Sequence, residues 1–141
     1  MKTYNYYIGI DPGVQTGTAI WIKKEKTFLS LATDSIHVAF ETIKSINENF
    51  KESGVFIRVE DARQRSWYGE NSNAKLQGAG SVKRDCKIWE DFLTDIKADF
   101  EMVAPKKGMT KHNAETFRRM TGYIGKTSSH SRDAAILVFG F

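Results

Sequence analysis

The sequence has little cysteine, little proline and no long apolar run. Its single cysteine, Cys86, excludes an internal disulfide framework and a zinc cluster built from several cysteines. No stretch approaches the roughly 18 consecutive apolar residues of a membrane-spanning helix, so we expect no membrane partner. Only two prolines and no repeated or biased tract occur in 141 residues. These features exclude a collagen-like, disordered or low-complexity chain.

The pattern of a secretory signal is also absent at the start, where one lysine is followed directly by a strand-like run. Together with the scarcity of cysteine, this predicts a reducing, cytoplasmic location. The composition, with 40% hydrophobic and 27% charged residues, is typical of a globular protein. We expect residues 1–141 to form a single domain, because no linker interrupts this ordinary domain length.

Positive charge is concentrated late in the chain. Residues 1–60 hold seven Lys or Arg and seven Asp or Glu, a balance of zero. Residues 105–132 hold seven Lys or Arg against one Glu, a balance of +6. Such a segment indicates either a polyanionic partner, such as nucleic acid, or a solvated face, and charge alone does not separate the two.

Short apolar and aromatic runs predict five strands, and longer periodic patterns predict four helices. The predicted strands cover residues 4–10, 18–22, 27–32, 55–59 and 100–104. The first helix follows a cap at Asp34 or Ser35 and stops before Ser53-Gly54. The other predicted helices cover residues 76–98, 113–122 and 129–139. Residues 61–75 are expected to form a polar loop.

The element order βββ-α-β-α-β-α-α predicts an α/β fold. Its mixed five-stranded sheet combines three antiparallel strands with two parallel ones and is flanked by helices. Right-handed crossovers place the fourth strand parallel to the first. If these strands are neighbours, Asp11 and Glu60 lie at adjacent carboxyl ends, which is where open α/β sheets place their sites.

Three acidic residues stand in unusual positions. Asp11 and Glu60 each end an apolar strand, and Asp133 lies in an apolar helix with His130 three residues before it on the same face. At 5 Å and an effective dielectric constant near 20, each pair of ionised carboxylates would repel by about 3 kcal/mol. The group must therefore take up protons or bind cations. Oxygen ligands with one imidazole suit Mg²⁺ or Mn²⁺, and two such ions about 3.5–4 Å apart can drive phosphodiester hydrolysis.

Each of these residues also has an ordinary structural interpretation. Asp11 could be a turn residue before Pro12-Gly13, and Glu60 could pair with Arg58 or Arg63.

His130 could be a cap or a core histidine. Asp133 needs a partner if it is buried, and an arginine could supply one. The candidate arginines are Arg118, Arg119 and Arg132.

Three motifs in this order, spread over nearly the whole chain, carry a family resemblance. They are Ile8-Gly9-Ile10-Asp11-Pro12-Gly13 with Thr16-Gly17, then Val59-Glu60, then His130-Ser131-Arg132-Asp133-Ala134-Ala135. The chain resembles RuvC-like Holliday junction resolvases of the ribonuclease H-like superfamily, especially small phage-type members. If it is encoded by a phage, the cytoplasm is that of the bacterial host.

The resemblance implies a metal-dependent endonuclease that cuts four-way and related branched DNA junctions. Asp11, Glu60 and Asp133 would be metal-binding catalytic carboxylates. His130 falls where many relatives have a fourth acid and some have histidine, so it would ligate metal or position water. Two Mg²⁺ ions per site are implied, with Mn²⁺ able to substitute. Water would attack the phosphodiester and leave a 5′-phosphate and a 3′-hydroxyl.

A homodimer is implied as well, because two sites must cut two strands of a junction symmetrically. In the family, the second long helix contributes to dimerisation. Here that helix carries Cys86 and Trp89, and we favour the interior of the chain's own core for both.

Candidate DNA-binding residues follow Glu60 and recur in the basic segment. The loop after Glu60 combines basic residues with adjacent aromatics, which neutralise phosphate and stack on unpaired bases. Alternatively, Trp67 anchors the loop, and the lysines are simply solvated. The candidates are Arg63, Arg65, Trp67, Tyr68, Lys75, Lys106, Lys107, Lys111 and Arg118.

Other functions remain open at this point. A ribonuclease H-like nuclease could act on flaps, other branched DNA or RNA–DNA hybrids. A junction-binding module would bind branched DNA without cutting it. The clustered acids argue against this function, because they repel a polyanion. A nucleotide-binding protein of the actin and sugar-kinase type usually needs two such domains, and this chain has room for one.

Overall fold

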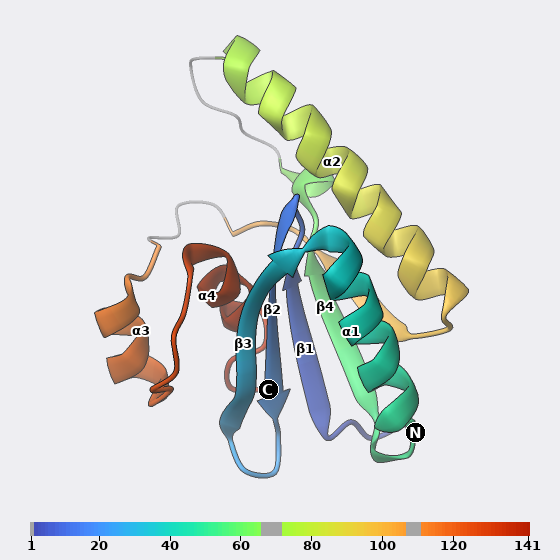
Figure 1. The fold of residues 1–141 in the computed structure, drawn as a ribbon, viewed down its shortest axis with the longest axis vertical. Coiled ribbons are helices and arrows are strands. Elements are labelled where there is room, and N and C mark those ends of the chain that lie inside the picture. Colours follow the sequence, from blue (N-terminus) through green and yellow to red (C-terminus); the bar gives the residue numbers. More distant parts are fainter. Residues whose placement is uncertain (1, 66–71, 107–110) are drawn as a thin grey trace.

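In a computed structural model of the chain, five strands form one mixed sheet in the order β3-β2-β1-β4-β5 (Figure 1). The structure describes residues 2–65, 72–106 and 111–141, and only the backbone of residues 72–79. β1 pairs antiparallel with β2 and β2 with β3, whereas the β1–β4 and β4–β5 pairs are parallel. The strands are β1 (Tyr6–Asp11), β2 (Gln15–Ile22), β3 (Thr27–Ser35), β4 (Val55–Glu60) and β5 (Asp99–Val103). The predicted α/β class and strand directions are confirmed.

Helices cover both faces of the sheet (Figure 1). They are α1 (Ile36–Asn49), α2 (Ser72–Asp95), α3 (Ala114–Thr121) and α4 (Ser129–Ile136). α1 and α2 pack on one face, and α3 and α4 pack on the other. Among the described residues, no helix is both long and apolar enough to cross a membrane.

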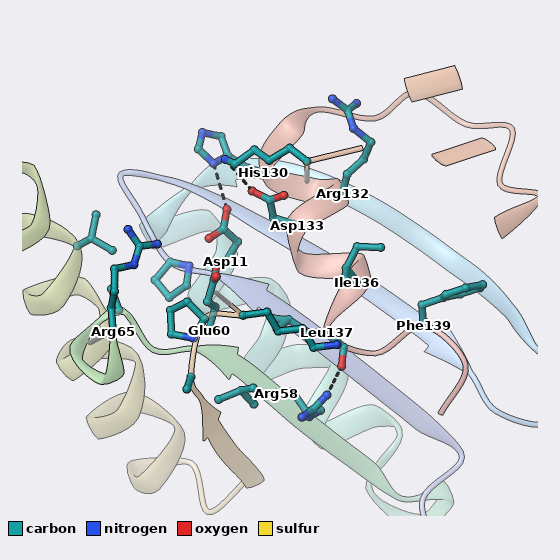
Figure 2. A pocket seen from close by; sticks show the side chains of 18 of the residues that line it. Asp11, Arg58, Glu60, Arg65, His130, Arg132, Asp133, Ile136, Leu137 and Phe139 are labelled. Atoms are coloured by element: carbon teal, nitrogen blue, oxygen red, sulfur yellow. Dashed lines mark hydrogen bonds and ion pairs between the residues drawn. The ribbon is translucent and has the colours of Figure 1, made fainter. Parts of the chain in front are cut away.

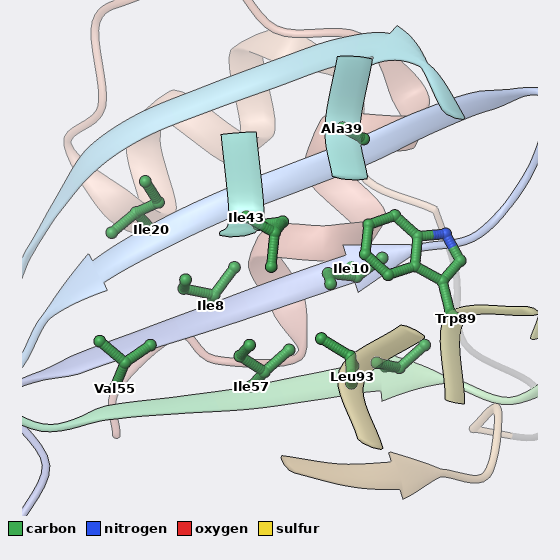
Figure 3. Close-up of a cluster of buried hydrophobic side chains, with 10 residues drawn as sticks. Ile8, Ile10, Ile20, Ala39, Ile43, Val55, Ile57, Trp89 and Leu93 are labelled. Carbon is green, nitrogen blue, oxygen red and sulfur yellow. The ribbon is translucent and has the colours of Figure 1, made fainter. Parts of the chain in front are cut away.

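The two faces hold separate apolar cores, because successive side chains of a strand point to opposite faces. Between the sheet and α1–α2, branched aliphatic side chains pack with Trp89 (Figure 3). This core contains Ile8, Ile10, Ile20, Ala39, Ile43, Val55, Ile57, Val59, Trp89 and Leu93. The core under α3 and α4 contains Ala19, Trp21, Phe28, Leu31, Phe117, Ala134, Ala135 and Val138.

The α2 residues Cys86 and Trp89 are both fully buried within the single chain, as predicted. The Trp89 ring lies 4.5 Å from that of Phe40 on α1 and 5.8 Å from that of Phe92, measured between centroids. Neither Cys86 nor Trp89 is therefore exposed for a contact between subunits.

Several predicted boundaries are wrong. The segment 61–75 is not all loop, because Ala62–Gln64 forms a 3₁₀ turn and α2 already begins at Ser72. β2 begins three residues early and β3 runs three residues further, since antiparallel pairing continues from Gln15–Ser35 onward. α4 ends at Ile136 rather than residue 139, because the Leu137 N–H bonds the carbonyl of Ala134 in a tighter turn.

Candidate active site

Asp11 and Glu60 end the two central parallel strands side by side. The β1–β4 register pairs Ile10 with Val59, so the next residue on each strand carries one of the acids. The carboxyl group of Asp11 is only 14% exposed. The predicted convergence of these two acids at one sheet edge is therefore confirmed.

α4 rests directly on the sheet because two glycines leave room for its backbone. An ideal Cβ on Gly9 of β1 would stand 1.9 Å from the carbonyl oxygen of Ala134. One on Gly17 of β2 would stand 2.1 Å from the carbonyl oxygen of His130. No larger residue fits beneath the helix at either position, and this close approach brings the start of α4 to the end of β1.

The first turn of α4 is fixed by a reciprocal cap. The hydroxyl of Ser128 accepts a hydrogen bond from the backbone N–H of Ser131, and the Ser131 hydroxyl accepts one from the N–H of Ser128. His130 lies in this turn, and its Nδ1 is 3.2 Å from Oδ2 of Asp11. His130 is half exposed and caps nothing, so neither its core nor its capping interpretation holds.

Asp133 lies one turn further along α4 and faces the same space (Figure 2). Its Oδ2 is 3.2 Å from Nζ of Lys111. The arginine partners considered from sequence are not used. Arg132 donates instead to the carbonyl of His112, at 2.9 Å, and to the hydroxyl of Thr127, at 2.8 Å.

The alternative partners of Glu60 are occupied elsewhere. Arg58 pairs with Glu101 of β5 at 2.6 Å. Arg63 pairs with Asp61 at 2.8 Å and is also bonded to Glu90. Glu60 therefore pairs with neither of these arginines. It shares a hydrogen bond with Asp11, and the positive charge of Arg65 lowers its pKa.

Burial is the main cause that raises the pKa of Asp11 to about 6 and the pKa of Glu60 to about 7. The two carboxyl groups share a hydrogen bond, which lowers the pKa of Asp11 and raises that of Glu60. The charge of Asp133 raises both pKa values further. The pair therefore retains a proton at a pH where ordinary carboxyl groups have lost theirs.

The four side chains line a single cavity of about 610 Å³ (Figure 2). One end is acidic, with basic residues around it, and the other end is apolar and aromatic. The basic residues on its wall are Arg58, Arg65, Lys106, Lys111 and Arg132. The apolar end includes Ile136, Leu137, Phe139 and Phe141. A cavity of this size and mixed character is typical of a site that binds a small molecule or part of a larger one.

Three of the predicted DNA-binding residues, Arg65, Lys106 and Lys111, lie on the cavity wall. Arg63 does not, because its guanidinium is bonded to the buried Asp61. Arg118 is exposed on α3 away from the cavity.

The remaining candidates lie in parts of the chain that the structure does not describe. Trp67, Tyr68 and Lys107 fall outside the described residues, and of Lys75 only the backbone in α2 is described. Their predicted contacts with DNA stay predictions.

Arg58 is a residue that the sequence reasoning missed as part of this region. It lies in an apolar strand, which is a detectable signal. Its guanidinium bonds Glu101, donates to the carbonyl of Leu137 just after α4, and lies 4.5 Å from the ring centroid of Phe141. It thereby ties the end of α4 to the parallel half of the sheet.

The donor set at the acidic end fits a hard divalent cation. Three carboxylates and an imidazole are ligands that Mg²⁺ and Mn²⁺ accept. Among the described residues, no three such side chains already converge as a closed metal site does. Asp11 is turned to Glu60 and His130, and Asp133 is turned to Lys111. A proton and a lysine thus provide the charge compensation that a bound cation would otherwise give.

Comparison with known proteins assigns no family. No family model matches the chain, and no curated protein matches it in sequence. The geometry and charge of the cavity therefore carry the functional interpretation.

Proposed function

We propose that this protein is a metal-dependent nuclease of the ribonuclease H-like class that hydrolyses phosphodiester bonds in branched DNA. The observation that carries the proposal is the convergence of Asp11, Glu60, His130 and Asp133 at one end of a cavity. These residues come from three different elements. Arg58, Arg63 and Arg132 are engaged elsewhere, and Asp133 pairs with the exposed Lys111. Burying Asp11 and Glu60 beside each other and near Asp133 costs stability, so stability alone gives no reason to gather the three acids.

The proposed reaction forms a bond between a water oxygen and phosphorus as the bond from phosphorus to the 3′ oxygen breaks. The leaving oxygen takes up a proton, which yields a 3′-hydroxyl and a 5′-phosphate. Bound Mg²⁺ or Mn²⁺ ions would stabilise the charge on the phosphate and lower the pKa of the attacking water. Asp11, Glu60 and Asp133 would hold these ions.

His130 stands at the exposed rim of the acidic end. Its contact with Asp11 fixes the imidazole ring beside the carboxylates. From this place it either ligates a metal or holds the attacking water and accepts its proton.

The basic residues around the cavity supply contacts for the DNA backbone. Arg65 and Lys106 line the cavity from two different segments, and the charge of Arg65 acts on Glu60. Positive groups here neutralise phosphates, so binding should weaken steeply as the salt concentration rises. This arrangement favours a nucleic acid substrate over a small neutral one.

The preference for four-way junctions, and the homodimer that would cut them symmetrically, rest on the resemblance noted in the sequence. The cytoplasmic location likewise stays a prediction. Flaps, other branched DNA and RNA–DNA hybrids are alternative substrates for the same chemistry, and junction binding without cleavage is the alternative function.

The decisive experiment is cleavage of a labelled four-way junction beside matched duplex, flap and hybrid substrates, in Mg²⁺, Mn²⁺ or EDTA. Asp11→Asn and Asp133→Asn are the test variants. Asp99→Asn is the matched control, because this acid starts β5 and pairs with Lys2 outside the cavity.

Symmetric nicks that need metal and vanish in both test variants, but not in the control, would support junction resolution. Cleavage of flaps or hybrids instead would keep the nuclease and reject the junction preference. Salt-dependent junction binding without cleavage, unchanged in the test variants, would show a binding module.

A further inference from the structure

Lys111 places a positive charge beside the carboxylate cluster. Its Nζ lies 3.2 Å from Oδ2 of Asp133. Its positive charge also lowers the pKa of Asp11, so the ammonium acts on acids from both α4 and β1. The side chain is nevertheless 76% exposed, which leaves it free to swing away from the cluster.

The backbone next to Lys111 is anchored to α4. Arg132 donates from Nε to the carbonyl of His112 and from NH1 to the hydroxyl of Thr127. Because Arg132 directly precedes Asp133, this contact holds Lys111 beside the carboxylate it pairs with. The backbone beside Lys111 is therefore held against α4, while the exposed end of its side chain can change position.

We propose that Lys111 couples metal binding to DNA binding, by neutralising Asp133 in the free protein and moving to a substrate phosphate when a divalent cation takes its place. This inference rests on the proposed function, because it needs both a metal and a phosphate at this site. A free ammonium and a divalent cation cannot both be close partners of Asp133 without repelling each other. A phosphate next to the cluster gives the displaced ammonium a new partner.

The coupling must be reciprocal. If DNA relieves the competition between Lys111 and the metal, DNA tightens metal binding, and metal tightens DNA binding by the same factor. An ion pair as exposed as this one supports an effect of about 1.5- to 5-fold. The biological consequence is that the protein binds its metal more tightly on substrate than in the free state.

The test measures Ca²⁺ binding by isothermal titration calorimetry, without and with an intact four-way junction. The variants are Lys111→Met, which removes the charge, and Lys111→Arg, which keeps it. Lys2→Met is the matched control, because Lys2 also forms an exposed lysine–aspartate ion pair, 3.1 Å from Asp99, but lies outside the cavity. Gel analysis of the recovered DNA verifies that the junction stays uncut.

We expect Lys111→Met to bind Ca²⁺ about 1.5- to 5-fold more tightly than wild type when DNA is absent. The further gain on adding the junction should be lost in this variant and kept in Lys111→Arg and Lys2→Met. An unchanged or weaker affinity of Lys111→Met for Ca²⁺ without DNA would overturn the inference.

Failure of the inference can be told apart from failure of the proposed function. If Asp133→Asn abolishes Ca²⁺ binding and Lys111→Met leaves it unchanged, the metal site stands and the coupling is rejected. If Asp133→Asn binds Ca²⁺ as wild type does, the metal site itself is wrong. Circular dichroism of each variant verifies that a lost signal is not a lost fold.

Discussion

The backbone of Gly17 lies directly against the carbonyl of His130, so close that a Cβ at position 17 would stand 2.1 Å from the carbonyl oxygen. Real Cβ atoms do not approach a backbone oxygen this closely, and the oxygen belongs to a helix that cannot yield locally. The position of His130 relative to Asp11 is therefore set by the absence of a side chain on the neighbouring strand.

Replacing Gly17 with alanine should push α4 away from the sheet. We expect a loss of about 3 kcal/mol or more in the free energy of unfolding, because the clash is with backbone. In the molecules that still fold, His130 should lie further from Asp11, and DNA cleavage should be lost. Urea denaturation followed by circular dichroism measures the first effect, and junction cleavage measures the second.

Gly80→Ala is the matched control, and its effect on the free energy of unfolding should have the opposite sign. Gly80 lies in α2, and no described atom stands within 4 Å of the place where its Cβ would be. Alanine should therefore stabilise the helix by about 0.5–1 kcal/mol. Equal destabilisation by both substitutions would contradict the close-packing account.

The metal-free protein should lose stability as the pH rises from 5 to 8. The pKa values of Asp11 and Glu60 are raised to about 6 and about 7, so the folded state holds protons that the unfolded chain has released. Deprotonation through this window thus costs on the order of 1–3 kcal/mol. Thermal unfolding in EDTA across this range measures the loss.

Adding Mg²⁺ or Mn²⁺ at pH 8 should restore the lost stability, because a ligand that binds only the folded state stabilises it. Asp11→Asn should show a flatter pH profile in EDTA and little response to metal. A wild-type profile that rises with pH in EDTA would contradict the assignment of a shared proton.

Arg58→Met should loosen the end of α4. The variant loses the ion pair with Glu101 and the bond to the Leu137 carbonyl, which leaves that carbonyl without its charged donor. We expect about 1–3 kcal/mol of destabilisation, measured by urea denaturation. Lysine should rescue little, because one ammonium cannot reproduce the planar fork that reaches both acceptors.

Glu101→Gln is the milder companion variant. Its carboxylate is 48% exposed, so water can replace the ion pair. We expect less than about 1 kcal/mol of destabilisation. A Glu101→Gln loss equal to that of Arg58→Met would place the energy in the ion pair and not in the link to α4.

Much of the fold follows from local patterns in the sequence. Alternation of apolar residues predicts β1 and β4, and the crossover rule makes them parallel, so Asp11 and Glu60 meet without any knowledge of packing. The convergence of His130 and Asp133 with them depends on where α4 lies. That position is set by Gly9 and by Gly17, whose role only a three-dimensional contact reveals.

Ion-pair partners that are distant in sequence were harder to predict. Lys111 is one of several lysines in a basic segment, and its neighbours in sequence do not distinguish it from the others. Only the position of α4, which carries Asp133, shows that this lysine has an acidic partner. The pairing of Arg58 with Glu101 likewise depends on the β4–β5 register. Ion pairs between residues distant in sequence are decided by tertiary packing, which periodicity does not encode.

Neighbouring acids at the end of β4 should respond to neutralisation in opposite ways. Burial opposes ionisation of Asp61, but hydrogen bonds from Arg63 and Gln64 outweigh it and lower the pKa of this acid. The pKa of Glu60 is raised instead, by burial and by Asp11. Asp61 is therefore stabilising when charged, and Glu60 is destabilising when charged in the metal-free protein.

Asp61→Asn should accordingly lower the stability at pH 8 by about 2 kcal/mol, since it breaks a buried charged pair with Arg63. That difference should shrink as the pH falls below the ordinary aspartate range, where the wild-type stabilisation is lost as well. Glu60→Gln should raise the stability at pH 8 in EDTA and abolish both metal binding and cleavage. Urea denaturation at pH 8 and pH 3, with calorimetric Ca²⁺ titration at pH 8, separates the two acids. Metal binding lost in Asp61→Asn but kept in Glu60→Gln would reverse the assignment of the ligand at this strand end.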